Sequence, residues 1–189
     1  MSEAKRRIAA FNLDLKRLLL RELALMSAAP ADGEVETYLE VQSLPTVLVP
    51  RQRREIIEWM RMQPNECHAN AYAFTQLDPN KRSRMVIGWQ CGSTIPRLHS
   101  VVDQFGDGNL VCVTPGPFEV LSFRVDPDIE IRLDGKHTRR GRLAPTLLRA
   151  DPWATIEAAK AAKALIDAGV EVLKIPQEIL DKFGVPISK

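Results

Sequence analysis

The sequence predicts an α+β protein in which helices pack against an antiparallel sheet. Two observations predict this class: helix signals at both ends of the chain, with apolar periodicity near the N-terminus, and several short runs of β-forming residues in its middle. Of the 189 residues, 45% are hydrophobic and 26% charged, a composition typical of globular proteins. We therefore expect a single domain. Its predicted segments are a helical lead-in (1–62), a core (63–133), a basic loop (134–149) and C-terminal helices (150–189).

The first predicted helix covers residues 4–27. Apolar residues recur there at three- and four-residue spacing, among them Phe11, Leu18, Leu23 and Met26, with basic residues between them. This spacing places the apolar side chains on one face of an amphipathic helix. The basic face is expected to be solvated.

Prolines divide the segment that follows. Residues 35–49 contain Pro45 and predict extended chain with a short edge strand. A second helix is expected over residues 51–62, because Pro64 would stop it.

The middle of the chain predicts a short helix and then a meander of strands. Asn65 is a favoured N-cap residue, and Asp78 and Pro79 are expected to end this helix. Glycines and aspartate in residues 106–109 predict a tight turn between two of the strands. The predicted strands are 84–91, 98–104, 110–114, 118–125 and 129–133.

Residues 134–149 are rich in arginine and predict an exposed loop. Asp151 and Pro152 are typical of a helix start, and Gly169 of a helix end, so a long helix is expected between them. A small helix over residues 177–182 follows.

Charge and cysteine content exclude several classes of protein. The net charge is only +2, so attraction to nucleic acid requires a local basic cluster. The apolar runs are too short to span a bilayer or to form a signal peptide, so we expect a cytoplasmic protein with no membrane span. Three cysteines are too few for a disulfide framework. Phosphate-binding and dinucleotide-binding motifs are absent, and no cofactor is expected.

Cys67 is the most reactive cysteine that the sequence predicts. It follows the predicted N-cap Asn65, where unpaired backbone N–H groups and the positive end of the helix dipole favour a thiolate. A thiolate nucleophile also needs a general base, which a neighbouring sheet can bring from a distant part of the sequence. His99 near the start of a predicted strand fits that role. The turn places it opposite Thr114, with Cys112 on the same face.

These residues resemble a known fold. The stretches are N-E-C-H-A-N-A from Asn65, G-W at Gly88, H-S-V-V from His99 and C-V-T-P from Cys112. Together they resemble the papain-like and transglutaminase-like cysteine fold, most closely in small bacterial proteins. The resemblance covers roughly residues 60–120 and implies an order of nucleophile, histidine and acid.

The chain departs from that pattern at the acid. The family places Asp where this chain has Cys112, so the triad is incomplete, and a catalytically inactive scaffold is an alternative. Asn109, Thr114 and Asp103 are candidates to support His99 instead. Gln63 and Asn65 are candidate oxyanion-hole groups, and Trp89 is a core aromatic that is also a candidate wall of the cleft.

The predicted function is a thiol-dependent hydrolase or acyltransferase acting on an amide, isopeptide or related acyl bond. Cys67 would attack the carbonyl and His99 would move the proton, with a peptide or protein as the expected substrate. A zinc site is an alternative that the spacing does not support, so no metal is expected. Its candidate ligands are Cys67, His68, Cys91, His99 and Cys112.

A second alternative uses the basic loop. In this reading the core is an inactive scaffold, and the loop binds nucleic acid or a protein partner by neutralising negative charge. The absence of interleaved aromatic residues disfavours nucleic acid. The residues involved are Lys136, Arg139, Arg140, Arg142 and Arg149.

Overall fold

The computed structural model describes residues 2–92, 95–132 and 134–186. The chain forms two compact units. The helical unit contains Met1–Val35 and Arg149–Lys189, and the sheet unit contains Glu36–Leu148. The two ends of the chain thus share one unit, whereas the predicted segments follow the chain linearly. The single-domain prediction stays a prediction.

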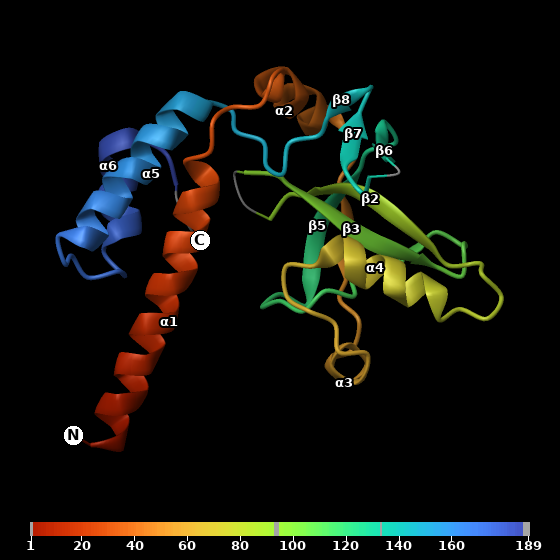
Figure 1. Ribbon diagram of the computed structural model, residues 1–189, viewed down its shortest axis with the longest axis horizontal. Coiled ribbons are helices and arrows are strands. Elements are labelled where there is room, and N and C mark those ends of the chain that lie inside the picture. The colour runs from red at the N-terminus through yellow and green to blue at the C-terminus, as the bar shows by residue number, and fades with distance from the viewer. Residues whose placement is uncertain (1, 93–94, 133, 187–189) are drawn as a thin grey trace. The chain divides into compact units, whose positions relative to one another are not determined.

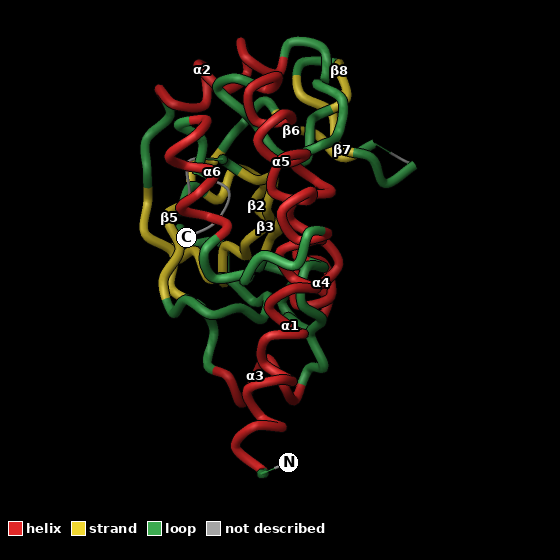
Figure 2. The backbone as a smooth tube through the Cα atoms, turned by 90° about the vertical axis from the view of Figure 1, so that its left-hand side faces the viewer, coloured by secondary structure: helices red, strands yellow, loops and turns green. Residues whose placement is uncertain are grey.

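Three helices, α1 (Glu3–Met26), α5 (Pro152–Asp167) and α6 (Ile175–Phe183), build the helical unit. Helix α5 packs against both α1 and α6 (Figure 2). The sequence predicts all three helices, α1 from its apolar periodicity and α5 from its start and stop residues. The predicted apolar face of α1 is buried only toward its C-terminal end, at Leu23 and Met26, whereas Phe11 and Leu18 are exposed.

An internal ion pair also holds the helical unit together. Arg149 is 2% exposed and donates from Nε to Glu34 Oε1 over 2.7 Å. Its Nη1 donates to the carbonyls of Met26 and Ala28. The prediction that Arg149 lies in an exposed loop is therefore wrong, because its charge is matched by a buried carboxylate.

The segment after Gly33 is helical at first. Helix α2 (Glu34–Ser43) replaces the predicted extended chain, which is correct only for the short strand β1 (Val47–Pro50). The side chain of Glu34 accepts a hydrogen bond from the N–H of Ala31 and stabilises the helix start. Tyr38 and Val41 are three residues apart and join the same apolar cluster, which is helical spacing.

Five strands form the main sheet of the sheet unit, in the order β1-β5-β2-β3-β4 (Figure 1). All their strand pairs are antiparallel. The predicted meander is confirmed, and its second hairpin pairs Val102 with Val111 as the predicted turn requires. The strands not yet bounded are β2 (Arg84–Gln90), β3 (Arg97–Gln104), β4 (Asn109–Val111) and β5 (Val120–Val125).

The two edge strands of this sheet meet at one point. Arg51, just after β1, forms a parallel bridge with Cys112, just after β4. Cys112 donates its N–H to Pro50 O over 2.9 Å and accepts from Gln52 N over 2.8 Å. The curled sheet encloses a core of Val49, Val101, Cys112, Leu121 and Phe123.

Two helices lie between β1 and β2 in the sequence. Helix α3 (Arg54–Trp59) is short, and α4 (Cys67–Gln76) lies along β3 (Figure 1). The buried face of α4 carries Ala71, which packs against Val102, Val111 and Val113. This contact fixes the start of α4 beside the N-terminal half of β3. None of the helices in the described part of the chain combines the length and apolar character that crossing a bilayer requires.

The predicted basic loop is a small second sheet. Strands β6 (Ile129–Ile131), β7 (His137–Arg139) and β8 (Arg142–Leu143) pair in that order. The loop prediction is therefore wrong: Gly135 and Gly141 have positive φ and supply the turns that let residues 129–143 fold back on themselves. Leu133, at the end of a predicted strand, lies outside the described residues.

Candidate active site

Cys67 is the first helical residue of α4, and Glu66 is the N-cap. The prediction that Asn65 caps this helix is wrong. Asn65 has a φ of 66° and is exposed, so it forms the left-handed turn before the helix, a conformation that asparagine tolerates. Cys67 nevertheless lies among the unpaired N–H groups of a helix start.

The Cys67 thiol is largely buried, with 9% of the residue exposed. Burial raises the pKa of Cys67, while the backbone N–H groups of Ser100 and His68 act in the opposite direction. The predicted preference for thiolate is therefore wrong, because the cost of removing a thiolate from water exceeds the stabilisation by these amides. The resting nucleophile is a neutral thiol.

His99 is held by Cys112. Its Nε2 lies 3.4 Å from the Cys112 Sγ, and its ring meets Phe123 edge-on at 6.3 Å between centroids. Burial, and then the charges of His68 and Arg51, lower the pKa of His99 to about 4. The group that contacts His99 comes from the segment after the turn, but it is the thiol of Cys112 rather than an acid.

The Cys112 contacts indicate the tautomer of His99. The Cys112 Sγ lies 3.8 Å from Thr114 O, to which the thiol donates its weak hydrogen bond. The sulfur is then the acceptor for an N–H at His99 Nε2, and His99 Nδ1 carries the lone pair. Nδ1 has no hydrogen-bond partner among the described residues, so a base site stays open on this ring.

The structure does not join Cys67 and His99 directly. In the described chain no hydrogen bond links the Cys67 sulfur to the His99 ring. Ser100 explains this arrangement, because its hydroxyl contacts His68 Nδ1 at 2.6 Å and so faces α4. Neighbouring strand residues face opposite sides, which directs the His99 side chain toward the core side of β3.

The other predicted supports of His99 lie elsewhere. Thr114 Oγ1 accepts a hydrogen bond from Asn70. Asn109 pairs with Gln104 at the far end of β3. Asp103 is engaged by Arg84 Nε over 2.8 Å and by the N–H of Gly108. None of the three contacts His99.

Asn70 is a positioning residue that sequence reasoning missed. Its Oδ1 accepts from Gln63 N over 3.0 Å, and its Nδ2 donates to Gln63 O over 2.7 Å. With the contact to Thr114, Asn70 ties the loop before Cys67 to the sheet. The signal was an amide three residues after Cys67, on the buried face of an Ala-rich helix. The exposed side chain of Gln63, a predicted oxyanion group, donates to Arg61 O.

Arg51 is the second residue missed. Its Nε donates to Phe118 O over 2.6 Å, and its Nη1 lies 3.7 Å from the Cys112 Sγ. A Cβ at Gly116 would lie 2.7 Å from Nη2, so the guanidinium packs closely over this glycine. No sequence signal predicts this contact, because it depends on the meeting of the two edge strands.

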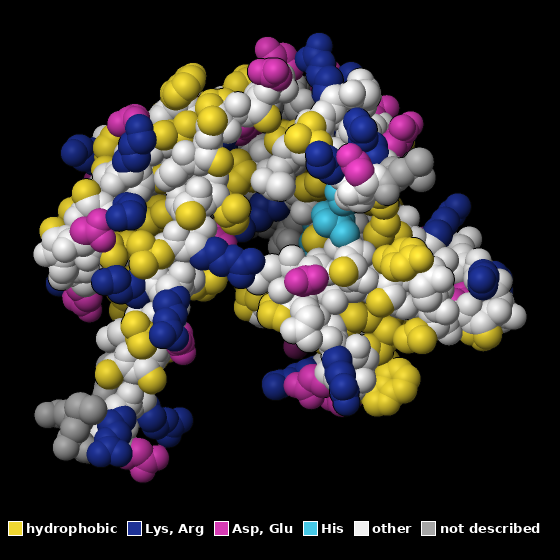
Figure 3. Space-filling view, in the orientation of Figure 1, with side chains coloured by type: hydrophobic (Ala, Val, Ile, Leu, Met, Phe, Trp, Pro, Cys, Tyr) yellow, Lys and Arg dark blue, Asp and Glu magenta, His cyan; other side chains and the backbone are white. Residues whose placement is uncertain are grey.

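A pair of stacked histidines adjoins Cys67. The rings of His68 and His137 are 4.0 Å apart between centroids, and His137 Nε2 is buried without a hydrogen-bond partner. Burial, and then the charge of His137, lower the pKa of His68 to about 4. His137 is thus half-buried in the packing on β7. Histidine side chains reach the surface of the sheet unit on the face that carries α4 (Figure 3).

Trp89 belongs to the core. It is 0% exposed, and its Nε1 donates to Asp126 Oδ2 over 2.8 Å. Its apolar neighbours include Val41 and Leu148. The prediction of a core aromatic is confirmed, and its complete burial contradicts a place in the wall of an open cleft.

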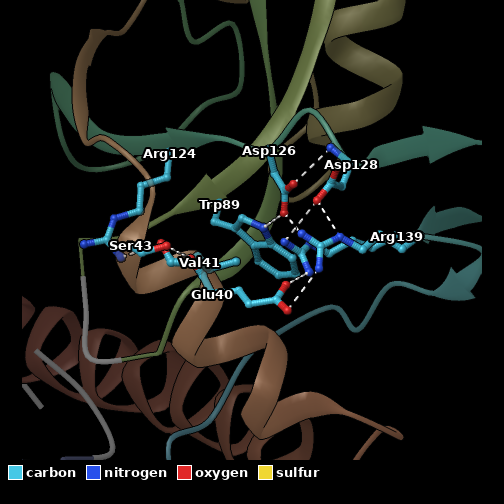
Figure 4. Close-up of polar contacts among 9 residues, drawn as sticks. Glu40, Val41, Ser43, Trp89, Arg124, Asp126, Asp128 and Arg139 are labelled. Atoms are coloured by element: carbon cyan, nitrogen blue, oxygen red, sulfur yellow. Dashed lines mark hydrogen bonds and ion pairs between the residues drawn. The ribbon is translucent and has the colours of Figure 1, made fainter.

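Arg139 uses its charge inside the protein. Its guanidinium forms ion pairs with Glu40, with Asp126 at 2.7 Å and with Asp128 at 3.5 Å (Figure 4). Only 8% of its side chain is exposed. Arg140 is exposed but also paired, to Glu40 and Asp128. Lys136 and Arg142 remain at the surface. Binding of nucleic acid or a protein partner by this basic segment stays a prediction. Fewer of its positive charges are unpaired than the sequence indicates, because Arg139 and Arg140 form ion pairs with acids of the same unit.

The predicted zinc ligands do not gather. Cys91 lies in the Trp89 cluster, away from the Cys112 core. In residues 2–92, 95–132 and 134–186, no group of three or more His, Cys, Asp and Glu side chains is arranged to hold a metal ion.

Comparison with protein-family models, with curated proteins and with solved structures gives no match to this chain.

Proposed function

We propose that the sheet unit is a papain-like or transglutaminase-like thiol enzyme that transfers or hydrolyses an acyl group. Cys67 is the nucleophile and His99 the general base. Cys112 occupies the position that the acid takes in that family. The substrate class is an amide, isopeptide or related acyl bond of a peptide or protein.

The contact between His99 Nε2 and Cys112 Sγ carries this proposal. It occupies one ring nitrogen and leaves Nδ1 as a free base on the residue next to Ser100. The N–H of Ser100 is one of the backbone amides close to the Cys67 sulfur. Because His99 faces the core side of β3 and Cys67 begins the helix on its other side, side-chain rotation alone does not complete the hydrogen bond. The start of β3 or of α4 has to shift when substrate binds.

The reaction proceeds in two balanced steps. The Cys67 sulfur bonds to the carbonyl carbon while its proton passes to His99 Nδ1. The leaving amine or alcohol takes that proton, and a thioester remains on Cys67. Water or an acceptor amine then attacks the thioester, gives its proton to His99, and the thiol is restored. Because the resting thiol is neutral, proton transfer accompanies the attack.

Acylation by 4-nitrophenyl acetate tests the nucleophile. We expect the intact protein to gain one acetyl group, located on Cys67 by peptide mass spectrometry and released by neutral hydroxylamine. The adduct should be lost in Cys67→Ala and retained in Cys91→Ala, a matched control at a second partly buried thiol. Acetylation of Cys91 as fast as Cys67, or of lysines alone, would overturn the proposal.

A further inference from the structure

We propose that Arg51 forms an anion subsite beside the candidate active site and selects acyl groups or peptides that carry a carboxylate. The inference rests on the proposed function in taking Cys67 as the reacting thiol. It adds a substrate class to that function.

The first argument is the unmatched charge of Arg51. Among the described residues, its guanidinium contacts a carbonyl oxygen, at Phe118, and a thiol sulfur, at Cys112, but no carboxylate. The buried arginines Arg139 and Arg149 are instead paired with acids. A half-buried guanidinium that has no carboxylate partner keeps capacity for a charged ligand.

The second argument is that the guanidinium is fixed in place. Phe118 O holds its Nε, and Gly116 leaves the space that Nη2 and Cζ occupy. A guanidinium held before binding loses little side-chain entropy when it forms the two parallel hydrogen bonds that a carboxylate accepts. Arg51 is therefore positioned to bind an anion that the described residues do not supply.

The third argument is the surface around Arg51. Arg51 contributes to a groove of about 470 Å³ between β1 and β4, and it is the only charged residue in the lining. The other lining residues are apolar or neutral, among them Leu48, Gln104 and Leu110. This volume suits a few residues of extended peptide. One positive charge matches a carboxylate better than a doubly charged phosphate.

The position of Arg51 connects this subsite to the chemistry. Its Nη1 contacts Cys112, and Cys112 in turn contacts His99. A carboxylate bound at Arg51 is thus connected to the proposed base, His99, through Arg51 and Cys112. An acyl group with a carboxylate a few bonds from its carbonyl is the substrate that this arrangement favours.

Two reagents of nearly equal shape test the subsite without acyl transfer. Iodoacetate carries a carboxylate, whereas iodoacetamide is neutral, and each forms one S–C bond and releases iodide. We measure both rates at Cys67 by peptide mass spectrometry and divide the first by the second. The expected ratio is about tenfold above that of glutathione under the same conditions, because a local positive charge concentrates anions.

Three variants assign the effect. Arg51→Gln should lower the ratio to that of glutathione, and Arg51→Lys should retain part of it. Arg53→Gln removes the same charge from an exposed side chain two residues away and should leave the ratio unchanged. A ratio in the native chain no higher than that of glutathione, or an equal loss in Arg53→Gln, would overturn the proposal.

If Arg51→Gln fails to fold, the salt dependence of the ratio in the native chain tests the subsite. Raising sodium chloride from low to about 0.5 M should reduce the ratio at Cys67, because salt screens the charge, and a ratio insensitive to salt would contradict the subsite. An Arg51-dependent ratio in a protein that forms no Cys67 thioester would retain the subsite and reject acyl transfer. A protein that forms the Cys67 thioester but shows no preference for iodoacetate would retain acyl transfer and reject the subsite.

Discussion

At the scale of single residues, burial decides the state of both reacting groups. The sequence predicts a thiolate at Cys67, from its place at a helix start, and a general base at His99. Burial acts on both charged forms, raising the pKa of Cys67 and lowering that of His99. Both shifts favour the neutral thiol and the neutral imidazole.

The pH dependence of alkylation checks this neutral pair. Iodoacetamide reacts with the thiolate, whose fraction below the pKa rises tenfold per pH unit. Because the pKa of Cys67 lies above its ordinary value, the rate should climb without a plateau from pH 5 to pH 9. His99, with a pKa of about 4, adds no step near neutral pH. A plateau already reached at pH 7 would indicate a thiolate–imidazolium pair.

Cys112→Asp should make the His99 ring easier to protonate. A carboxylate beside His99 Nε2 stabilises the imidazolium, so the pKa of His99 should rise from about 4 by at least ~1 unit. Proton NMR titration of the His99 ring gives the pKa, and Cys112→Ser is the neutral control. An unchanged His99 pKa would show that residue 112 does not act on this ring.

At the scale of elements, the position of His99 depends on a close approach of strands. Gly88 on β2 pairs with His99 on β3 and with Val125 on β5. A Cβ at Gly88 would lie 2.1 Å from Arg124 O, a backbone atom that cannot move alone. Glycine at this position therefore permits the pairing of β2 with β5.

Gly88→Ala should destabilise the sheet unit by about 1–3 kcal/mol, the usual cost of overpacking. Urea unfolding followed by circular dichroism measures the loss. Gly92→Ala is the matched control, since a Cβ there meets no atom within 4 Å, and its effect should stay within ~0.5 kcal/mol. Equal stability of the two variants would mean that the strands separate without cost.

Elements were predictable where a local pattern decides them. The periodicity of α1, the start and stop residues of α5, the turn before β4 and the register of Val102 with Val111 follow from neighbouring residues. Helix α2 was missed because Pro45 follows it, and β7 and β8 were missed because their arginines are typical of exposed loops. Their stability depends on distant partners, as the ion pairs of Arg139 demonstrate.

The candidate site was predictable only in part, for the same reason. Cys67 and His99 stand out by residue type and by their places on a helix and a strand. Arg51 lies far from Cys112 in sequence, and their contact arises only when the edge strands meet. Neighbouring residues of β3 face opposite sides, but which of His99 and Ser100 faces α4 depends on the side of the sheet that this helix covers.

At the scale of the whole molecule, distant parts of the chain complete each unit. Arg149 and Glu34 are separated by 115 positions, and each is 2% exposed. Neither residue has a local signal for burial. The sequence therefore predicts Arg149 at the surface, whereas in the fold its ion pair with Glu34 connects the N-terminal and C-terminal segments of the helical unit.

Arg149→Met should destabilise the helical unit by about 3–5 kcal/mol, because it leaves the Glu34 carboxylate buried without its partner. The double variant Arg149→Met with Glu34→Leu should recover much of the loss, since no unpaired charge remains. Urea unfolding of the two variants and the native chain gives these differences. A loss below ~1 kcal/mol in the single variant would contradict an essential pair.

The central claim is that His99 activates Cys67, and the rate of acetylation by 4-nitrophenyl acetate tests it most directly. Cys91 in the same molecule serves as the internal reference. The account predicts that His99→Gln slows acetylation of Cys67 by about a hundredfold or more and leaves Cys91 unchanged. Equal Cys67 rates in the native and His99→Gln proteins would contradict it.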